Sequence, residues 1–394
     1  MLGRFWRALP WDGLGWGRSP DPVLSDLRAW AAASWRQAQA RPWRPLLGPG
    51  ARAGWPLAAL GPVLAFARAR GLDGAATARL YGDCLLTGGG PVDVYVWRSL
   101  WGGLHPLPGR GAGLLLSRLG DSTGHALLAD KLEAAERLAM ADIPVPVMRG
   151  VYRRGAACDV SLLADAAPGQ DLFLKPRHGQ GGRDAFALTR LDGVWHMGGR
   201  PVSSAELMAR LARLVLRDDL LVQERLVAAQ EVADLAVNGR APVLRLATAR
   251  LPGQAPFLHS ALLTLAVPGR NPRHFLEGAV HAPVDPAEGR LVAGLTLAAP
   301  RTRLDRLTWN GALLAGRSVP GFAQAAAMVL RAMAALPPLP LVHWDLIPTE
   351  AGPVLLEGNS CGNWILACLP GLHGLEACPL PPLLARWLPD DRRL

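Results

Sequence analysis

The chain has 394 residues, half of them hydrophobic, and a formal net charge of +10. This length is sufficient for two or three domains with large cores, and no stretch of about 18 apolar residues is free of charge, which argues against a membrane-spanning helix. The five cysteines form no CxxC pair and are odd in number, which favours a reduced, cytoplasmic protein.

The first 120 residues differ from the rest in charge and aromatic content. They hold 14 Arg against 6 Asp and no Glu, and nine of the 14 Trp. Arg together with Trp suits an anionic membrane surface. The simpler interpretation is a helical domain with buried Trp and solvated Arg. No binding motif accompanies the charge, so nucleic acid is not an expected partner.

The N-terminal part is expected to be mostly helical. Helices are predicted near residues 22–40, 57–70, 73–86 and 92–101. Pro and Gly cluster at 102–113 and indicate a boundary. The predicted domains are therefore residues 1–110 and residues 111–394.

The second part alternates between helical and extended patterns. Helices are predicted over residues 127–143, 203–217 (with Ser203 or Ser204 as N-cap) and 321–336. Strands are predicted over 145–152, within 171–188, over 220–226, within 231–251 about a turn at Asn238-Gly239, over 256–267, and as a hairpin over 341–359. The expected fold class is α+β, or mixed α/β.

Lysine is almost absent from this chain. Of 42 basic residues only Lys131 and Lys175 are lysines, and the other 40 are arginines. Arg is a broad planar fork, whereas Lys is a compact charge that reaches a single phosphate oxygen. Two retained lysines therefore predict two places where a compact charge is needed, although survival by chance would give the same count.

The predicted hairpin over residues 341–359 carries the clearest chemistry. If Thr349 pairs with Pro353, then Asp345 lies opposite Glu357, and Asn359 lies on the same face because side chains alternate. Two carboxylates and an amide oxygen are the ligands that Mg²⁺ takes beside nucleotide phosphates. A solvated carboxylate pair at a sheet edge is the alternative, but the surrounding residues are apolar.

The segment "RHGQGG" follows the predicted strand that contains Lys175. Glycines allow backbone N–H groups to approach phosphate oxygens. The segment is neither a GxGxxG motif that opens a helix nor a Walker A loop. Taken alone, it equally predicts an ordinary glycine turn.

From about residue 115 onward, the chain resembles the ATP-grasp superfamily. More closely, it is similar to the sugar-transfer-associated ATP-grasp group, which is related to carboxylate–amine ligases such as the α-L-glutamate ligases. The resemblance rests on the order of "DKLEAAERLAMADIPVP", "FLKPRHGQGG", "LLVQERL", "RLATARL" and "HWDLIPTEAGPVLLEGN" over some 280 residues. It implies two α/β subdomains that grip ATP, with a hinge near residues 221–227.

The resemblance also implies roles for individual residues. Lys131 and Lys175 would contact the nucleotide phosphates, and Arg245 would stabilise the developing phosphoryl charge. Two Mg²⁺ ions would be held by Asp345, Glu357 and Asn359. The remaining nucleotide contacts would be His178, Gly179, Gly181 and Gly182 in the flexible loop, Gln223, Glu224 and Leu226 at the adenine, and Glu231, with Asp234 as its competitor, at the ribose.

The implied reaction is an ATP- and Mg²⁺-dependent ligation through an acylphosphate. A small-molecule carboxylate would be joined to an amine, or to a sugar, on a saccharide or cell-envelope precursor. A kinase that phosphorylates a hydroxyl and a degenerate nucleotide-binding scaffold are the alternatives. Residues 1–110 would contact the inner face of the membrane or a glycosyltransferase.

Two features of the site depart from the family pattern. His343 stands where the family usually has an aliphatic residue or Gly. The sequence "NSCGNW", which begins at Asn359, differs from the common continuation, so the acceptor pocket is expected to be particular to this chain. Cys361 is interpreted as a packed thiol rather than a nucleophile or ligand, and a solvated loop position is the simpler interpretation of His178.

Overall fold

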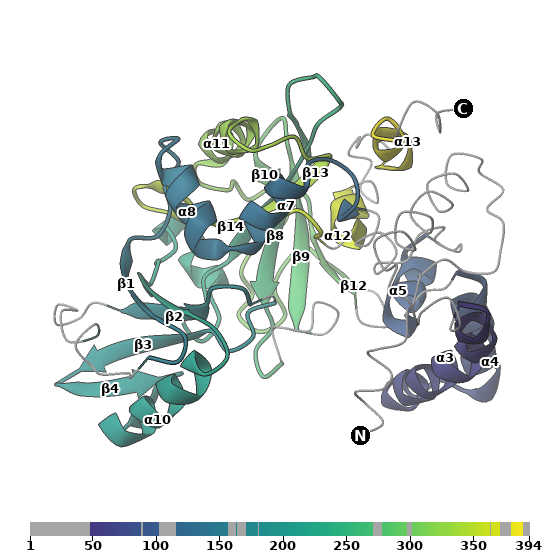
Figure 1. Cartoon of the computed structure of the whole chain (residues 1–394), viewed down its shortest axis with the longest axis horizontal. Coiled ribbons are helices and arrows are strands. Elements are labelled where there is room, and N and C mark those ends of the chain that lie inside the picture. The colour runs from purple at the N-terminus through teal and green to yellow at the C-terminus, as the bar shows by residue number, and fades with distance from the viewer. Residues whose placement is uncertain are drawn as a thin grey trace.

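The computed structural model describes residues 48–87, 90–101, 116–156, 163, 171–179, 181–270, 278–297, 302–362, 364–370 and 380–388. Two antiparallel sheets and a group of helices make up this part of the chain (Figure 1). The expected α+β class and the N-terminal helical region are confirmed. The helix expected near 22–40 lies outside the described residues.

The helices are α3 (Gly48–Arg70), α4 (Gly74–Thr87), α5 (Pro91–Trp101), α7 (Ser122–Ala129), α8 (Lys131–Ala139), α10 (Ser204–Val215), the 3₁₀ helix η2 (Gln230–Leu235), α11 (Phe322–Ala334), α12 (Trp364–Cys368) and α13 (Leu380–Ala385). No helix in the described ranges is both long enough and apolar enough to cross a membrane.

The strands are β1 (Met148–Tyr152), β2 (Leu172–Pro176), β3 (Phe186–Leu191), β4 (Val194–Met197), β5 (Arg200–Val202), β6 (Leu220–Glu224), β7 (Val243–Ala249), β8 (Phe257–Ala266), β9 (Ala279–Asp285), β10 (Arg290–Leu291), β11 (Gly294–Thr296), β12 (Thr302–Leu304), β13 (Leu341–Thr349) and β14 (Gly352–Asn359).

The small sheet has the order β1-β6-β2-β3-β4-β5. Its core is formed by α10, whose leucines at i, i+4 and i+7 pack against the inward residues of the strands. Ser203 caps α10, and its capping box with Glu206 confirms the predicted start of this helix. The face of β2 and β6 that points away from α10 is therefore available for a site.

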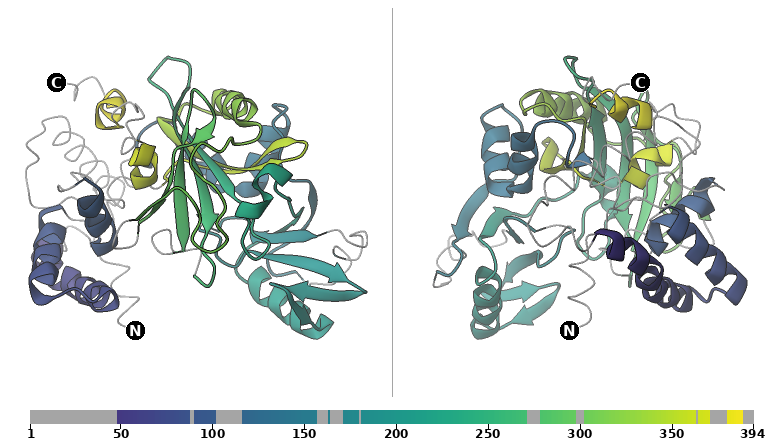
Figure 2. Two further views of the ribbon diagram at one scale, coloured as in Figure 1. Left: turned by 180° about the vertical axis from the view of Figure 1, so that it is seen from behind. Right: turned by 45° about the vertical axis from the view of Figure 1, so that its right-hand side comes forward.

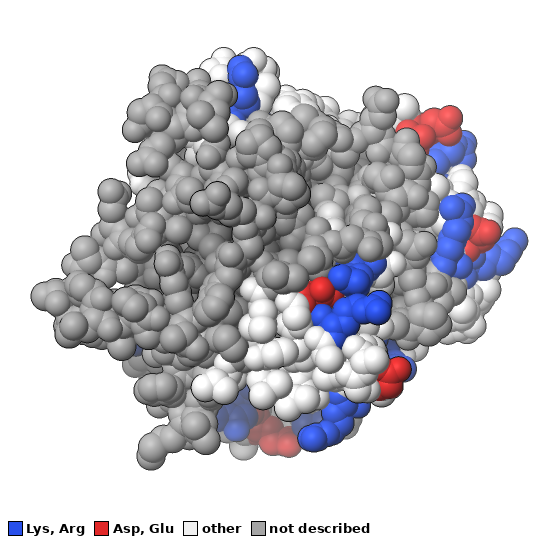
Figure 3. Space-filling model, turned by 90° about the vertical axis from the view of Figure 1, so that its right-hand side faces the viewer, with Lys and Arg blue, Asp and Glu red and all other residues white. Residues whose placement is uncertain are grey.

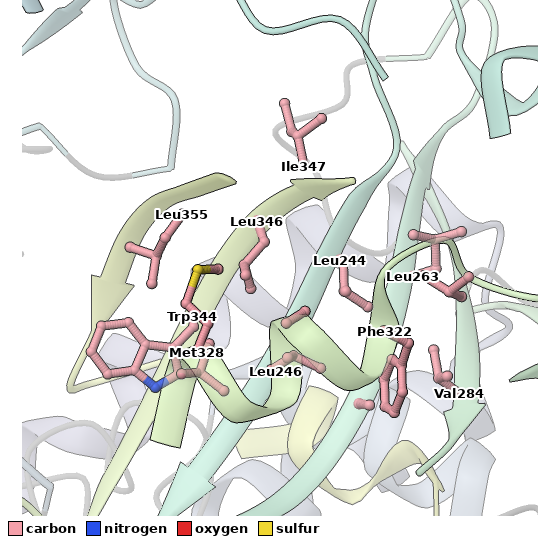
Figure 4. Close-up of a cluster of buried hydrophobic side chains, with 14 of the residues drawn as sticks. Leu244, Leu246, Leu263, Val284, Phe322, Met328, Trp344, Leu346, Ile347 and Leu355 are labelled. Atoms are coloured by element: carbon pink, nitrogen blue, oxygen red, sulfur yellow. The ribbon is translucent and has the colours of Figure 1, made fainter. Parts of the chain in front are cut away.

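The large sheet has the order β12-β11-β9-β8-β7-β13-β14, with β10 paired to β9. One face is covered by α11, and Figure 4 shows Phe322 and Met328 of this helix above Leu244, Leu246 and Trp344 of the strands. Because side chains alternate along a strand, the residues between these apolar ones point to the opposite face of the sheet.

The N-terminal helices lie beside the large sheet, on the side away from the small sheet (Figures 1 and 2). Val63, Leu80 and Val94 give α3, α4 and α5 a core of their own. In addition, Val96 in α5 packs in one cluster with Leu262 of β8. The helical unit formed by α3, α4 and α5 therefore also packs against the second part of the chain, and the proposed division at residue 110 lies outside the described residues.

Two parts of the element prediction were wrong. The single helix expected over 127–143 is two helices, because the side chain of Asp130 accepts hydrogen bonds from Leu132 N and Glu133 N and starts a new helix at Lys131. The strand expected from residue 231 is the helix η2, and the turn at Asn238-Gly239 closes only an isolated bridge.

Candidate functional site

The β13–β14 hairpin carries the three predicted metal ligands, but its turn differs from the prediction. Thr349 pairs with Gly352 and not with Pro353, so the turn is one residue shorter than expected. The predicted pairing of Asp345 with Glu357 is nevertheless confirmed. An irregularity in the register between Asp345 and the next residue reconciles the two observations.

This irregularity is a β-bulge at Leu356. Leu346 pairs with Leu355, and Asp345 pairs with Glu357, so Leu356 is the additional residue of β14. Leu346 and Leu355 both point into the core under α11. Without the additional residue, Glu357 would point to the same face as Leu355. The bulge therefore moves the Glu357 carboxylate to the face that carries Asp345.

Arg245 lies directly opposite Asp345 on the neighbouring strand β7. Its Nε donates to Asp345 Oδ1 at 2.7 Å, and its Nη2 donates to Oδ2 at 2.8 Å. Burial disfavours the charged guanidinium, but Asp345 and the more distant Glu357 outweigh burial and raise the pKa of Arg245. Asp345 is buried and Arg245 is partly buried, so removal of Arg245 would leave a buried carboxylate without this partner.

Lys175 enters the same site from the small sheet. It is 7% exposed, and its Nζ donates to the Leu356 carbonyl at 3.3 Å, so it contacts the bulge of the other sheet. Burial lowers the pKa of Lys175 to about 8; Glu357 and Asp345 oppose this shift, and Lys131 adds to it. The residues that the sequence singled out therefore meet between the two sheets.

Lys131 completes the group of cations. Its Nζ lies 4.0 Å from Glu357 Oε2 and donates a short hydrogen bond to the Gly179 carbonyl. Lys131, Lys175 and Arg245 face Asp345 and Glu357, so the group carries one net positive charge. An anion is therefore attracted to this position.

The glycine segment starts from an ion network that the sequence did not indicate. Arg177 donates to Asp130 at 2.7 and 2.5 Å and to Asp219 at 3.1 Å. The hydrogen bond from Arg177 is the main reason that the pKa of Asp130 is lowered. His178 is bound to Asp218 through its backbone N–H and its ring, at 2.7 and 2.9 Å. These contacts fix the start of the segment beside Lys131.

Gly181 and Gly182 continue this segment, both with a φ of 63°. This left-handed conformation favours glycine, and both residues are exposed. Consecutive residues of this kind turn the backbone sharply, as a phosphate-binding loop requires. The Gly179 carbonyl, by contrast, is already bound to Lys131.

The predicted adenine contacts lie at the end of β6. Gln223 is buried on the same face of the small sheet as Lys175, because both alternate with the residues that pack on α10. The Glu224 carboxylate pairs with Arg149, and its N–H donates to Val147 O at 3.0 Å. Leu226 packs against the core of the large sheet, so the chain passes from one sheet to the other at this point.

The two candidates for the ribose contact, Glu231 and Asp234, differ in whether their carboxylates already accept hydrogen bonds. Both oxygens of Asp234 accept hydrogen bonds from Arg317, at 3.0 and 2.5 Å. Glu231 gives Arg317 only its backbone carbonyl, and its side chain is exposed. This difference favours Glu231 over Asp234.

His343 lies two residues before Asp345 on the same face of β13 and pairs with Asn359. It is buried, and neither ring nitrogen has a hydrogen-bond partner in the described part of the chain. Burial, followed by Arg245 and His259, lowers the pKa of His343 to about 3. Each buried polar group without a partner costs about 1–3 kcal/mol.

Cys361 follows the hairpin on the same segment. Cys361 is exposed at the surface. The protein atoms around its sulfur nevertheless raise the pKa of the thiol by desolvation, so the thiol is mostly protonated near neutral pH. A protonated thiol is a poor nucleophile and a poor metal ligand. The expectation of a packed thiol was wrong, because Cys361 is exposed, but the raised pKa gives no support to a nucleophile or a metal ligand.

The potential metal ligands are oxygen atoms that suit a hard cation. Asp345 and Glu357 share one face, and Asn359 Nδ2 lies 3.4 Å from Glu357 Oε1, which leaves the amide oxygen of Asn359 for other contacts. Within the described ranges no cluster of three or more His, Cys, Asp or Glu side chains is suited to a metal. A metal site here therefore depends on two carboxylates and one amide.

Sequence reasoning missed several of these contacts. The Leu356 bulge is an irregularity within the hairpin that the alternation of side chains does not indicate. The partners of Arg177 lie in segments that are distant in the chain. Asp130 alone had a local signal, since an Asp directly before a helix is a common N-cap. Asp130 lies inside the helical pattern predicted over residues 127–143, which hid its role as an N-cap.

Comparisons with known proteins were made on the sequence and on the fold. A family model described as "Sugar-transfer associated ATP-grasp" matches residues 115–376. No functionally curated protein matches the sequence.

Among solved structures, a D-alanine–D-alanine ligase from Bacillus anthracis in complex with ATP is 11% identical, with a TM-score of 0.40 over 68% of this chain and 67% of that chain. The VanG D-Ala:D-Ser ligase from Enterococcus faecalis is 13% identical, with a TM-score of 0.42 over 68% and 63%. An L-amino acid ligase from Bacillus licheniformis is 13% identical, with a TM-score of 0.33 over 60% and 41%.

Proposed function

The chain belongs to the sugar-transfer-associated ATP-grasp family, and on that premise we propose that it is an ATP- and Mg²⁺-dependent ligase that joins a carboxylate to an amine through an acylphosphate. The observation that carries the proposal is the contact of Lys175 with the Leu356 bulge, which brings a buried cation from one sheet beside the carboxylates of the other. The family description supports a saccharide or cell-envelope precursor as the substrate.

ATP would bind between the two sheets. Lys131 and Lys175 would contact its phosphates, and the segment from His178 to Gly182 would close over them. The adenine would lie against Gln223, Glu224 and Leu226, and the ribose would contact Glu231. This arrangement is supported by the shared face of Gln223 and Lys175, and by the backbone conformation of the glycines.

Two Mg²⁺ ions would be held by Asp345, Glu357 and Asn359, and would neutralise charge on the phosphates. In the ligand-free protein each carboxylate already has a cation, since Arg245 binds Asp345 and Lys131 lies near Glu357. Binding would exchange these pairs, so that the basic side chains bind phosphate and the carboxylates bind metal. This exchange makes the binding of nucleotide and metal mutually favourable.

The proposed chemistry has two steps. A carboxylate oxygen of the substrate attacks the γ-phosphorus of ATP, the bond between the γ-phosphorus and the bridging oxygen breaks, and ADP leaves. An amine then attacks the acyl carbon, and phosphate leaves with the electron pair of the broken C–O bond. Arg245 is partly buried and lies beside Asp345, so its charge suits stabilisation of the transferred phosphoryl group.

A screen of ATP turnover tests the proposal. Purified protein is incubated with Mg²⁺, ATP and panels of amino acids and sugar acids, and the products are identified by mass spectrometry. ADP with a new amide supports the ligase. A phosphorylated product identifies the kinase instead, and ATP binding without turnover identifies a nucleotide-binding scaffold.

The low pKa of Lys175 gives a pH prediction for ATP affinity. Bound phosphate favours the charged ammonium, so ATP raises the pKa of Lys175 from its value of about 8 in the free protein. Affinity is therefore constant well below pH 8 and falls by up to about tenfold per pH unit above it, as expected for uptake of one proton. Calorimetric titration with ATP between pH 6.5 and 9.5 measures this dependence of affinity on pH.

The control for this experiment is Lys175→Met, whose weaker binding has no dependence on pH in the same range. An affinity of the wild-type protein that stays constant from pH 7 to 9.5 would contradict the assignment of Lys175 to the phosphates.

We also propose that the N-terminal helices contact an anionic membrane surface. Leu57, Leu60 and Leu64 repeat at i, i+3 and i+7 on α3 and are all exposed, with Arg68 one turn further on. The whole helix contains no acidic residue. Figure 3 views the molecule from this side and shows an uncharged area that is bordered by both basic and acidic side chains. An apolar stripe with flanking Arg is typical of interfacial helices.

The membrane proposal predicts flotation with anionic vesicles. Wild-type protein floats with phosphatidylglycerol vesicles at low salt and less at high salt, because each basic residue contributes about 1 kcal/mol. Replacement of Leu57, Leu60 and Leu64 by Ser abolishes flotation. Replacement of the exposed Leu191 and Leu216 by Ser is the control and leaves it unchanged. Wild-type protein that ignores such vesicles at low ionic strength would contradict the proposal.

A further inference from the structure

His343 occupies a place in the site for which the proposed reaction has no role so far. It alternates with Asp345 on β13 and pairs with Asn359 on β14, so it lies one residue pair beyond the two carboxylates. On its other side it pairs with Ala247 of β7, two residues from Arg245. The ring therefore lies beside the reacting groups but belongs neither to the phosphate contacts nor to the metal ligands.

The hydrogen bonding of His343 differs from that of His125 and His281. The His125 ring has Ser360 Oγ at 2.7 Å and Leu119 O at 2.8 Å, and the His281 ring has Thr264 Oγ1 at 3.2 Å. Both ring nitrogens of His343 are buried and have no partner among the described residues. The fold gains no hydrogen bond from this imidazole and bears the cost of burying it.

The short segment that contains Gly362 covers one side of the His343 ring. A Cβ at Gly362 would overlap the Cδ2 and Cγ atoms of His343, and its next nearest ring atom is Nε2. Gly362 therefore lies against the Cγ–Cδ2 edge of the ring, next to Nε2, and it follows Asn359 by three residues. A displacement of Cys361 and Gly362 would uncover this edge of the ring, while Ser360 stays hydrogen-bonded to His125.

A neutral imidazole presents one N–H donor and one nitrogen acceptor. The acceptor nitrogen suits an N–H of an amine, and the N–H suits a carbonyl or carboxylate oxygen. The backbone of His343 is held between β7 and β14, and Gly362 lies against its ring, which restricts the directions of these bonds. This combination fits an amine nucleophile that is held in one orientation.

We propose that His343 is the positioning residue for the amine acceptor, with which it forms a hydrogen bond when Cys361 and Gly362 move away from the ring. This inference rests on the proposed ligase reaction and extends it to the second step. It assigns the acceptor to the end of the β13–β14 hairpin beyond Asp345 and Glu357. The acceptor class is an amine with an N–H that donates to the ring.

The test compares wild-type protein with His343→Leu, His343→Gln and the matched control His281→Leu. Thermal unfolding, ATP affinity by calorimetry, and steady-state kinetics with the amine found in the turnover screen are measured for each. Hydroxylamine serves as a second, small nucleophile that traps the acylphosphate as a hydroxamate. The rate of hydroxamate formation therefore measures formation of the acylphosphate without the need for a positioned amine acceptor.

For His343→Leu we expect a melting temperature at least as high as that of wild type, unchanged ATP affinity and unchanged hydroxamate formation. The KM for the amine rises about tenfold, as loss of one hydrogen bond to the substrate implies. His343→Gln, which retains a donor and an acceptor, recovers most of this loss. His281→Leu lowers the melting temperature, because it leaves Thr264 without its histidine partner.

Two results would overturn the inference alone. One is a His343→Leu protein that melts as far below wild type as His281→Leu does, and the other is an unchanged KM for the amine. Wild-type protein that forms neither hydroxamate nor amide with any carboxylate would overturn the ligase proposal, and this inference with it. Hydroxamate and amide formation by the wild-type protein therefore distinguishes failure of the ligase proposal from failure of the His343 inference alone.

Discussion

Glu357→Gln is expected to abolish turnover, by at least about 10³-fold, and to leave the fold intact. The carboxylate would hold both Mg²⁺ ions, and a neutral amide cannot offset the charge of two divalent cations. A loss of this size corresponds to several kcal/mol of transition-state stabilisation. Turnover of ATP at saturating Mg²⁺ measures the effect.

The fold should tolerate this change because Glu357 contributes little to stability. Its nearest cation, Lys131, lies 4.0 Å away, and the Glu357 side chain is 28% exposed. Pairs of this kind contribute about 0–1 kcal/mol. The melting temperature should therefore change little, and circular dichroism checks the fold.

Glu350→Gln provides the matched control in the same hairpin. The Glu350 side chain lies in the turn and accepts from Gln230 N at 2.6 Å, an interaction that an amide oxygen also makes. Its turnover should stay close to that of wild type. Comparable activity of Glu357→Gln and wild type at saturating Mg²⁺ would contradict the metal assignment.

Lys175→Arg is expected to weaken ATP binding nearly as much as Lys175→Ala, by more than about tenfold in each case. Lys175 is buried, and its ammonium ends at the carbonyl of Leu356. A guanidinium is wider and would displace the bulge that keeps Glu357 on the correct face. Charge alone therefore does not restore the site.

Calorimetric titration with ATP measures both variants against Arg213→Lys, an exchange on the exposed side of α10 that should have no effect. An arginine at position 175 that binds ATP like the wild-type lysine would show that the site does not require a compact charge. The scarcity of lysine in the chain would then carry no information about this position.

Much of the site could be predicted because its parts are local in sequence. The apolar residues around Asp345 and Glu357 and the turn between them specify a hairpin, and alternation of side chains then puts both acids on one face. The prediction of their pairing was correct even though the turn was misplaced by one residue. The bulge at Leu356 compensated for the difference.

The remaining contacts depend on pairings across long distances in the chain. Arg245 pairs with Asp345 because strand β7 lies next to strand β13. The two residues are 100 positions apart in the chain, and no local sequence pattern specifies that these strands are neighbours. The Lys175–Leu356 contact requires both the bulge and the approach of the two sheets. Register irregularities and the packing of sheets are tertiary features.

The helical prediction over residues 127–143 failed for a different reason. The apolar spacing continues through Asp130, but its carboxylate binds two backbone N–H groups and Arg177, and these bonds favour a break over a continuous helix. Local periodicity contains no information about Arg177. The break is what makes Lys131 the first residue of α8.

The fate of the carboxylate oxygen tests the acylphosphate reaction most directly. The substrate carboxylate is labelled with ¹⁸O at both oxygens, and the released phosphate is examined by mass spectrometry. If the carboxylate attacks the γ-phosphorus, the phosphate carries one ¹⁸O and the amide keeps the other. Phosphate without label, or a phosphorylated hydroxyl with no phosphate released, would contradict the account.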